Sequence, residues 1–195
     1  MSLIIETGAD LPSMVRVTPP AVLPVSLAMA KANMRVDGDD MDALITTWIK
    51  GIVAALEHEI GQCLIEQTWR VTADSFPAAL SLPHPVMSIT SIKYFDVDGT
   101  EQTMDPAAYR LVKMRYRSDL MPARGAAWPE TMADRDITVE VVCGYGAAPA
   151  DVPENAQLYI LAKLIEQFDP ATRMERDTVQ SAFVDRLLDA CRSYA

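Results

Sequence analysis

Residues 40–60 contain the feature that most constrains the fold, a continuous series of large hydrophobic residues at helical spacing. The series consists of Leu44, Ile45, Trp48, Ile49, Ile52, Val53, Leu56 and Ile60. Residues three and four positions apart share one side of a helix, so this spacing predicts a helix with one apolar side. Gly61 follows at the position where glycine commonly ends a helix. At ~1.5 Å per residue, the predicted helix is about 30 Å long.

The hydrophobic period changes after this helix, from helical spacing to alternation. Alternating segments rich in β-forming residues occupy 66–76, 87–104, 108–117 and 136–146. Within 87–104, Asp98 and Gly99 form a turn signal, so that segment predicts two strands of a hairpin. We count five or six strands between residues 65 and 145. The links between them are short, which predicts antiparallel pairing.

Helical spacing returns at residues 151–168. The expected buried side of this helix consists of Leu158, Leu161, Leu164, Ile165 and Phe168. We expect Trp48 and Phe168 to be buried on facing sides of their helices. A last helix is predicted at about 177–194, with Val179, Phe183, Leu187 and Cys191 along one side. A short helix over 27–34 is predicted before the long one, with Ser26 as its N-cap.

This order of elements predicts an α+β fold, in which N- and C-terminal helices form a helical core and an antiparallel β module is inserted between them. We expect residues 25–64 and 150–195 to form the helical core, and residues 65–149 to form the inserted module. Residues 1–24 are rich in proline toward their end, and they predict an irregular N-terminal arm that runs over a surface.

Four aspartates in six positions precede the long helix: Asp37, Asp39, Asp40 and Asp42. A calcium-binding EF-hand loop needs glycine at its sixth position and glutamate at its twelfth. Counted from Asp37, glycine comes second and Trp48 is twelfth, so the pattern does not fit. The aspartates instead suit the cap and first turn of the helix, where a carboxylate accepts backbone N–H groups and opposes the helix dipole.

The sequence offers no recognisable constellation for catalysis or metal binding. The segment His58–Gln62 starts like a zinc-protease motif but lacks its second histidine. His84, the other histidine, stands between two prolines in what we expect to be an exposed loop. The spacing of the three cysteines, Cys63, Cys143 and Cys191, fits neither a zinc site nor a disulfide framework. We expect them to be small buried residues of a protein in a reducing compartment. We therefore expect no cofactor and no enzymatic activity.

Charge and hydropathy argue against two further classes of protein. The chain carries 17 Lys and Arg against 27 Asp and Glu, a net charge of −10. Phosphate binding needs clustered cations, so a protein that wraps nucleic acid is not expected. No apolar run reaches the ~18 residues that a membrane span needs. We expect a soluble protein of the cytoplasm without a membrane partner.

One cationic pattern interrupts this acidic chain. Lys113, Arg115 and Arg117 alternate with apolar residues, which on a strand places three cations on one face. Two interpretations remain open. The face is either an ordinary solvated side of an antiparallel sheet, or a contact for an acidic neighbour such as another copy of this chain.

Five segments of the sequence have a familiar pattern: 17–45, 61–77, 86–111, 141–164 and 187–194. The most specific parts are Arg35-Val36-Asp37 between two helices and the passage from Gly144-Tyr145-Gly146 to Asp151-Val152-Pro153. With these segments, about residues 17–195 resemble a known family, the head–tail connector or portal adaptor proteins of tailed bacteriophages and prophages. None of these segments is a catalytic motif. Met29 and Asn33 depart from the family's usual residues.

The resemblance implies a structural protein of the virion that is assembled in the host cytoplasm. Such adaptors form a ring of about twelve copies, closed by head-to-tail contacts. The ring docks on the portal, extends the DNA channel and offers a site to the tail or a stopper protein. The expected subunit contact pairs Lys113, Arg115 and Arg117 with Asp37, Asp39 and Asp40. The alternatives are an enzymatic or ligand-binding α+β domain with an unidentified pocket, and a nucleic-acid-binding regulator.

Overall fold

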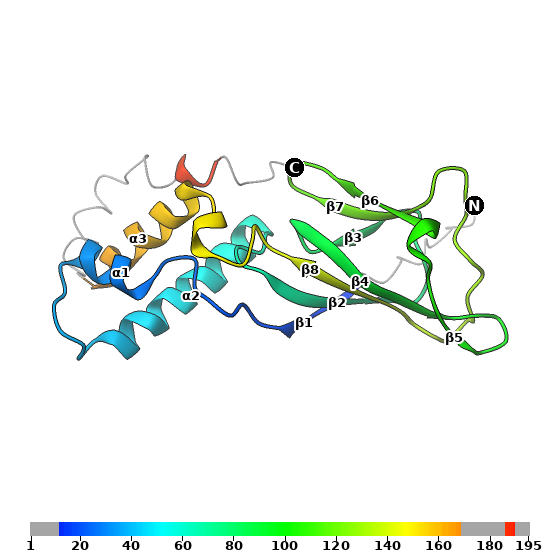
Figure 1. Ribbon diagram of the computed structural model, residues 1–195, viewed down its shortest axis with the longest axis horizontal. Coiled ribbons are helices and arrows are strands. Elements are labelled where there is room, and N and C mark those ends of the chain that lie inside the picture. The colour runs from blue at the N-terminus through cyan, green and yellow to red at the C-terminus, as the bar shows by residue number, and fades with distance from the viewer. Residues whose placement is uncertain (1–11, 169–185, 190–195) are drawn as a thin grey trace, which may run out of the picture.

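The computed structural model describes residues 12–168 and 186–189, and these form an elongated molecule with helices at one end and strands at the other (Figure 1). The helices are α1 (Leu27–Met34), α2 (Asp42–Ile60) and α3 (Glu154–Phe168). The strands are β1 (Ser13–Thr18), β2 (Gln67–Ala73), β3 (Leu80–Leu82), β4 (Val86–Phe95), β5 (Glu101–Thr103), β6 (Tyr109–Lys113), β7 (Ser118–Pro122) and β8 (Ile137–Cys143). The predicted α+β class with antiparallel strands is confirmed.

The helix boundaries follow local capping rules. Ser26 caps α1 as predicted, because its Oγ accepts the Met29 N–H at 3.1 Å. Arg35 ends α1 in the left-handed conformation with φ 57°. Gly61 ends α2 in the same conformation with φ 65°, as predicted. The predicted cap of α2 is wrong, because Met41 occupies the N-cap position and no side chain accepts a hydrogen bond there.

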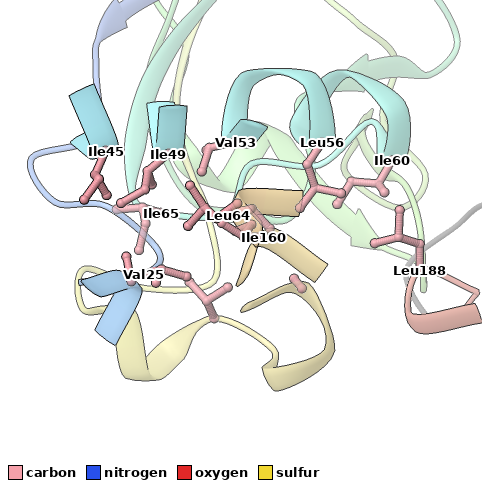
Figure 2. Close-up of a cluster of buried hydrophobic side chains, with 14 of the residues drawn as sticks. Val25, Ile45, Ile49, Val53, Leu56, Ile60, Leu64, Ile65, Ile160 and Leu188 are labelled. Atoms are coloured by element: carbon pink, nitrogen blue, oxygen red, sulfur yellow. The ribbon is translucent and has the colours of Figure 1, made fainter. Parts of the chain in front are cut away.

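The three helices and the segments beside them enclose one hydrophobic cluster (Figure 2). Its buried residues on α2 are Ile45, Ile49, Val53, Leu56 and Ile60. From α3, the buried residues are Ala156, Ile160 and Leu164. Leu188, in the short described stretch Arg186–Asp189, is fully buried in the same cluster. The rest of the predicted last helix lies outside the described residues.

The predicted apolar sides of the helices are partly wrong. Leu158 is 49% exposed and Phe168 is 37% exposed, although both were expected in the core. Leu44 is exposed, and Trp48 packs at the margin of the cluster and is only partly buried. The buried side of α3 runs through Ala156, Ile160 and Leu164, which follow one another at intervals of four residues. Leu158 is two residues from both Ala156 and Ile160, which places it on the opposite side of the helix.

The strands form two antiparallel sheets. The larger has the order β1-β2-β8-β4-β5 and the smaller has the order β3-β7-β6. Their inner sides enclose a second hydrophobic cluster that contains Val71, Leu80, Ile92, Leu120 and Val139. The hairpin turn at Asp98-Gly99 is present as predicted, because the Asp96 carboxylate accepts the N–H groups of Asp98 and Thr100.

Three strands were not predicted from the sequence. β3 and β7 pair with each other inside the smaller sheet, at Leu80–Leu120 and Leu82–Ser118. β1 lies within the segment expected to be irregular, and it pairs with β2 at the edge of the larger sheet. All six residues of β1 are exposed. These strands are short or exposed, so any alternation of hydrophobic and polar residues in them is too brief or too weak to identify a strand from the sequence.

Candidate functional site

The acidic segment before α2 forms an exposed loop at the helical end of the molecule (Figure 1). Lys31 Nζ lies 2.9 Å from Asp39 Oδ1 and 2.8 Å from Asp42 Oδ1. The hydrogen bonds that Lys31 donates to Asp42 and then to Asp39 raise the pKa of Lys31, and the bond that Asp39 accepts lowers the pKa of Asp39. The carboxylates therefore tie α1 to the start of α2 through one lysine, which is a role that the capping interpretation missed.

The three cations Lys113, Arg115 and Arg117 do not lie on one strand face. Strand β6 ends at Lys113, and residues 114–117 form the turn into β7. Met114 N donates to Arg117 O at 2.8 Å, which closes this turn. The observed strand β6 is shorter than the predicted one, because the chain must reverse direction for Ser118 to pair with Lys113. The cations remain close together, but on a hairpin turn.

Two of these cations already have partners within the chain. Arg117 forms an ion pair with Asp119 at 2.7 Å, and the Asp119 side chain is only 4% exposed. The Arg115 guanidinium lies 5.1 Å from the centroid of the Tyr116 ring. Among the described residues, Lys113 forms no ion pair, and the same is true of Asp37 and Asp40 in the acidic loop.

The cationic turn borders an open hollow of about 550 Å³ that is also lined by Gly61, Leu82 and His84. The expectation of an exposed His84 is wrong, since this residue is 8% exposed and its Nδ1 lies 2.9 Å from Ser118 Oγ. Burial lowers the pKa of His84, and the charge of Lys113 adds to this, while a hydrogen bond with the Arg115 backbone opposes it.

The structure gives no metal site within residues 12–168 and 186–189, since no three His, Cys, Asp or Glu side chains there are grouped to hold an ion. No helix in these ranges combines the length and apolarity needed to cross a bilayer. The loop between α1 and α2, which carries Asp37, Asp39 and Asp40, and the turn after β6, which carries the three cations, lie on separate parts of the molecule (Figure 1). Contact between them requires two copies.

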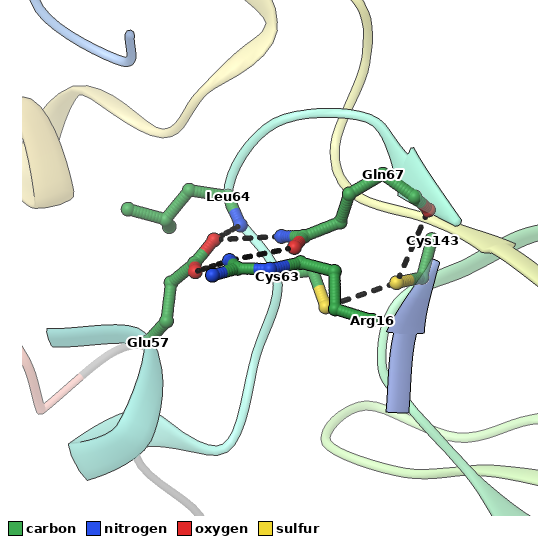
Figure 3. A network of polar contacts seen from close by, with 6 residues as sticks. All are labelled: Arg16, Glu57, Cys63, Leu64, Gln67 and Cys143. Carbon is green, nitrogen blue, oxygen red and sulfur yellow. Dashed lines mark hydrogen bonds and ion pairs between the residues drawn. The ribbon is translucent and has the colours of Figure 1, made fainter. Parts of the chain in front are cut away.

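A polar junction between the helices and the larger sheet was missed by the sequence analysis (Figure 3). Glu57 Oε1 accepts the Leu64 N–H at 2.8 Å and Gln67 Nε2 at 2.9 Å. Arg16 of β1 lies 3.9 Å from the other carboxylate oxygen. These contacts join α2, the linker after it, β1 and β2. A single glutamate on the polar side of a predicted helix gave no signal of this role.

We expect Glu57→Ala to lower the free energy of unfolding by about 1–3 kcal/mol, because two buried donors lose their acceptor. Glu57→Gln keeps an acceptor and should cost less. The measurement is urea unfolding at neutral pH. Equal losses in the two variants would show that the hydrogen bonds at this junction do not stabilise the fold.

The same variants test how the stability of the fold depends on pH through Glu57. Burial raises the pKa of Glu57, although the hydrogen bonds from Leu64 and Gln67 and the charge of Arg16 oppose the shift. The folded protein therefore holds this proton more tightly than the unfolded chain does. The stability that this pKa difference adds is fully present below the ordinary pKa of 4.5 and is lost as pH rises through the raised value, whereas the hydrogen bonds to Leu64 and Gln67 remain at neutral pH. Glu57→Gln should remove this slope.

No family model matches this sequence, and no curated protein matches it. The chain is similar to chains in solved structures of gene transfer agent (GTA) particles. In the neck of the empty GTA particle computed with C6 symmetry, the identity is 18%, the TM-score is 0.76, and the alignment covers 94% of this chain and 96% of that chain. In the virion of the native particle, the identity is 19%, the TM-score is 0.75, and the alignment covers 93% of this chain and 96% of that chain.

A third match, in the neck of the native GTA particle computed with C12 symmetry, has 19% identity and a TM-score of 0.66, and covers 91% of this chain and 96% of that chain. Identities this low establish a shared fold and nothing finer. The fold is one found in chains of GTA necks, so the resemblance to head–tail connector-type proteins is confirmed at the level of fold.

Proposed function

We propose that this chain is a structural protein of a phage-like particle, a head–tail connector that forms a ring without catalysis. The ring docks on the portal, extends the DNA channel toward the tail, and offers a site to the tail or a stopper protein. The protein resides in the virion once assembled, and in the host cytoplasm during assembly.

The observation that carries this proposal is the fold shared with GTA neck chains over nearly the full length of both chains. Two of the matched structures were computed with C6 and C12 symmetry, which describes copies repeated around an axis. A chain with this fold is therefore suited to a ring, in which each copy makes the same head-to-tail contact with the next.

The charge of the chain agrees with a channel that does not grip DNA. A net charge of −10 on every copy gives the ring an acidic character. Acidic walls repel the phosphate backbone, so DNA passes without being bound. The same charge opposes ring closure, because the copies repel one another. Each joint between copies then needs attractive short-range contacts.

Within this proposal, the cationic turn of one copy meets the acidic loop of the next. Lys113 and Arg115 have no carboxylate partner among the described residues, and Asp37 and Asp40 have no cationic partner there. The residues Arg117 and Asp39 belong to the same two surfaces, but both already form ion pairs within the chain. We therefore assign the main attraction to Lys113 and Arg115 facing Asp37 and Asp40.

We expect the double variant Lys113→Glu and Arg115→Glu to weaken ring formation at every salt concentration. Arg117 is left unchanged, since reversing it would place a second negative charge beside the buried Asp119 and damage the fold itself. The control is Lys50→Glu with Arg124→Glu, which changes the net charge equally at two exposed sites away from the turn. Sedimentation velocity at high protein concentration, over a salt series, measures both.

Moderate salt should favour the wild-type ring by screening the repulsion between copies. If the turn variant and the control form rings equally well, the contact between these two surfaces is wrong, and only the wider connector proposal stands. If both lose the ring equally, net charge and not this pairing controls assembly.

A further inference from the structure

Cys63 and Cys143 lie side by side where the helices join the larger sheet, although 80 positions separate them in the sequence (Figure 3). The Cys143 thiol donates to Cys63 Sγ across 2.9 Å, and Gln67 O lies 3.7 Å from Cys143 Sγ. Cys63 is 7% exposed and Cys143 is fully buried. The sulfur–sulfur distance is only about 0.9 Å longer than the ~2.05 Å of a disulfide bond.

Backbone hydrogen bonds hold both cysteines against the same short segment. Cys63 N donates to His84 O at 2.7 Å, and Gly144 N donates to Pro85 O at 2.9 Å. Cys143 is the last residue of β8 and is paired with both Gln67 and Val86. The two sulfurs are thus brought together by the path of the main chain and not only by a choice of side-chain rotamer.

We propose that Cys63 and Cys143 form a redox-sensitive lock, in which oxidation by a small-molecule disulfide joins them covalently. The bond would tie the linker after α2 to the end of β8. Those are two of the three places where the chain passes between the larger sheet and the helices, the third being the segment from β1 to α1, so the lock acts on the junction itself (Figure 1).

The chemistry follows thiol–disulfide exchange. Cys63, the more exposed thiol, loses its proton to solvent and attacks one sulfur of the oxidant to form a mixed disulfide. The other sulfur of the oxidant leaves and takes up a proton to become a free thiol. Cys143 then loses its proton, attacks the Cys63 sulfur of the mixed disulfide, and releases the second small thiol. Two protein thiols are oxidised by two electrons, and one small-molecule disulfide is reduced to two thiols.

Burial sets the rate of this reaction. The hydrogen bond to Cys63 and then burial raise the pKa of the Cys143 thiol, so little thiolate is present at neutral pH. The dithiol form is therefore expected to persist in a reducing compartment and to oxidise slowly outside it. If the chain is a connector, as proposed above, the lock would close after the particle leaves its host.

The test uses the full chain with Cys191→Ser, so that the third cysteine cannot pair. The folded protein is incubated with oxidised or with reduced glutathione. Peptide mapping then identifies any linked cysteines, and thermal unfolding is followed in both samples. We expect a Cys63–Cys143 link and a rise in Tm of roughly 5–15 °C, because the bond closes a long loop in the unfolded chain. Adding Cys63→Ser should abolish both effects.

Two results would overturn the lock. One is the absence of a Cys63–Cys143 link in folded wild-type protein and in the Cys191→Ser variant after oxidation. The other is a link that leaves Tm unchanged or lowers it, which would show that the junction must distort to form the bond. Mapping the wild-type chain keeps the test valid even if a serine variant does not fold, and neither readout depends on whether the chain forms rings.

Discussion

Gly144→Ala is expected to destabilise the protein by about 4 kcal/mol or more, which is enough to prevent folding in many domains of this size. Gly144 has φ 135°, a conformation that residues with a Cβ rarely adopt. A Cβ at this position would lie 2.6 Å from Glu66 N and 2.7 Å from Ile65 O. These are backbone atoms of the linker after α2, so no side chain can turn aside to make room.

The position matters because two linkers run past each other there. Tyr145 N donates to Leu64 O at 3.2 Å, and Glu66 N donates to Gly146 O at 2.9 Å. An added methyl group would separate these segments and break the bonds between them. Gly144 also belongs to one of the segments that resemble the connector family. The close approach of the two linkers explains in physical terms why this position needs a glycine.

Gly51→Ala is the matched control for Gly144→Ala. Gly51 lies within α2, and a Cβ there would meet no atom within 4 Å. Alanine is the better helix former, so we expect a gain of roughly 0.5–1 kcal/mol. Chemical unfolding followed by circular dichroism measures both variants. If Gly144→Ala is as stable as the wild type, the close approach of the two linkers is wrong.

Ile160→Ala should lower the free energy of unfolding by about 3–4 kcal/mol. Ile160 is fully buried on α3 and packs in the helical cluster with Leu56 and Leu64 (Figure 2). Truncation removes buried apolar surface and leaves a cavity that the surrounding helices fill only in part.

Leu158→Ala serves as the control on the same helix, where the side chain is 49% exposed. We expect a change within about 0.5 kcal/mol. The pair decides between two assignments of the helix face, because the sequence pattern put Leu158 on the buried side and the structure puts Ile160 there. Denaturant unfolding of dilute protein gives both values. A larger loss for Leu158 than for Ile160 would restore the sequence-based assignment.

The longest elements of the fold could be predicted because their hydrophobic period is strong. The α2 pattern runs for five turns and its glycine cap is explicit, so both the helix and its end were correct. Strands β3 and β7 could not be found this way. β3 has three residues, and β7 begins with the buried polar residues Ser118 and Asp119, which hide the alternation.

The two candidate contact surfaces, the acidic loop and the cationic turn, were likewise predicted only in part. Sequence reasoning located the acidic and cationic segments, since charge is visible without a structure. It misassigned their conformations, because the competition between a helix cap and the Lys31 ion pairs depends on how α1 and α2 pack. The cysteine pair could not be predicted at all. Its two members meet only through strand pairing between residues far apart in the chain.

Electron microscopy of the concentrated protein, imaged alone and after mixing with the portal protein of the same particle, tests the connector proposal most directly. We predict closed rings of the chain around an open axial channel, formed either by the chain alone or as a layer coaxial with the portal. Fields that contain only dispersed single subunits in both samples, with no chain bound to the portal, would contradict the proposal.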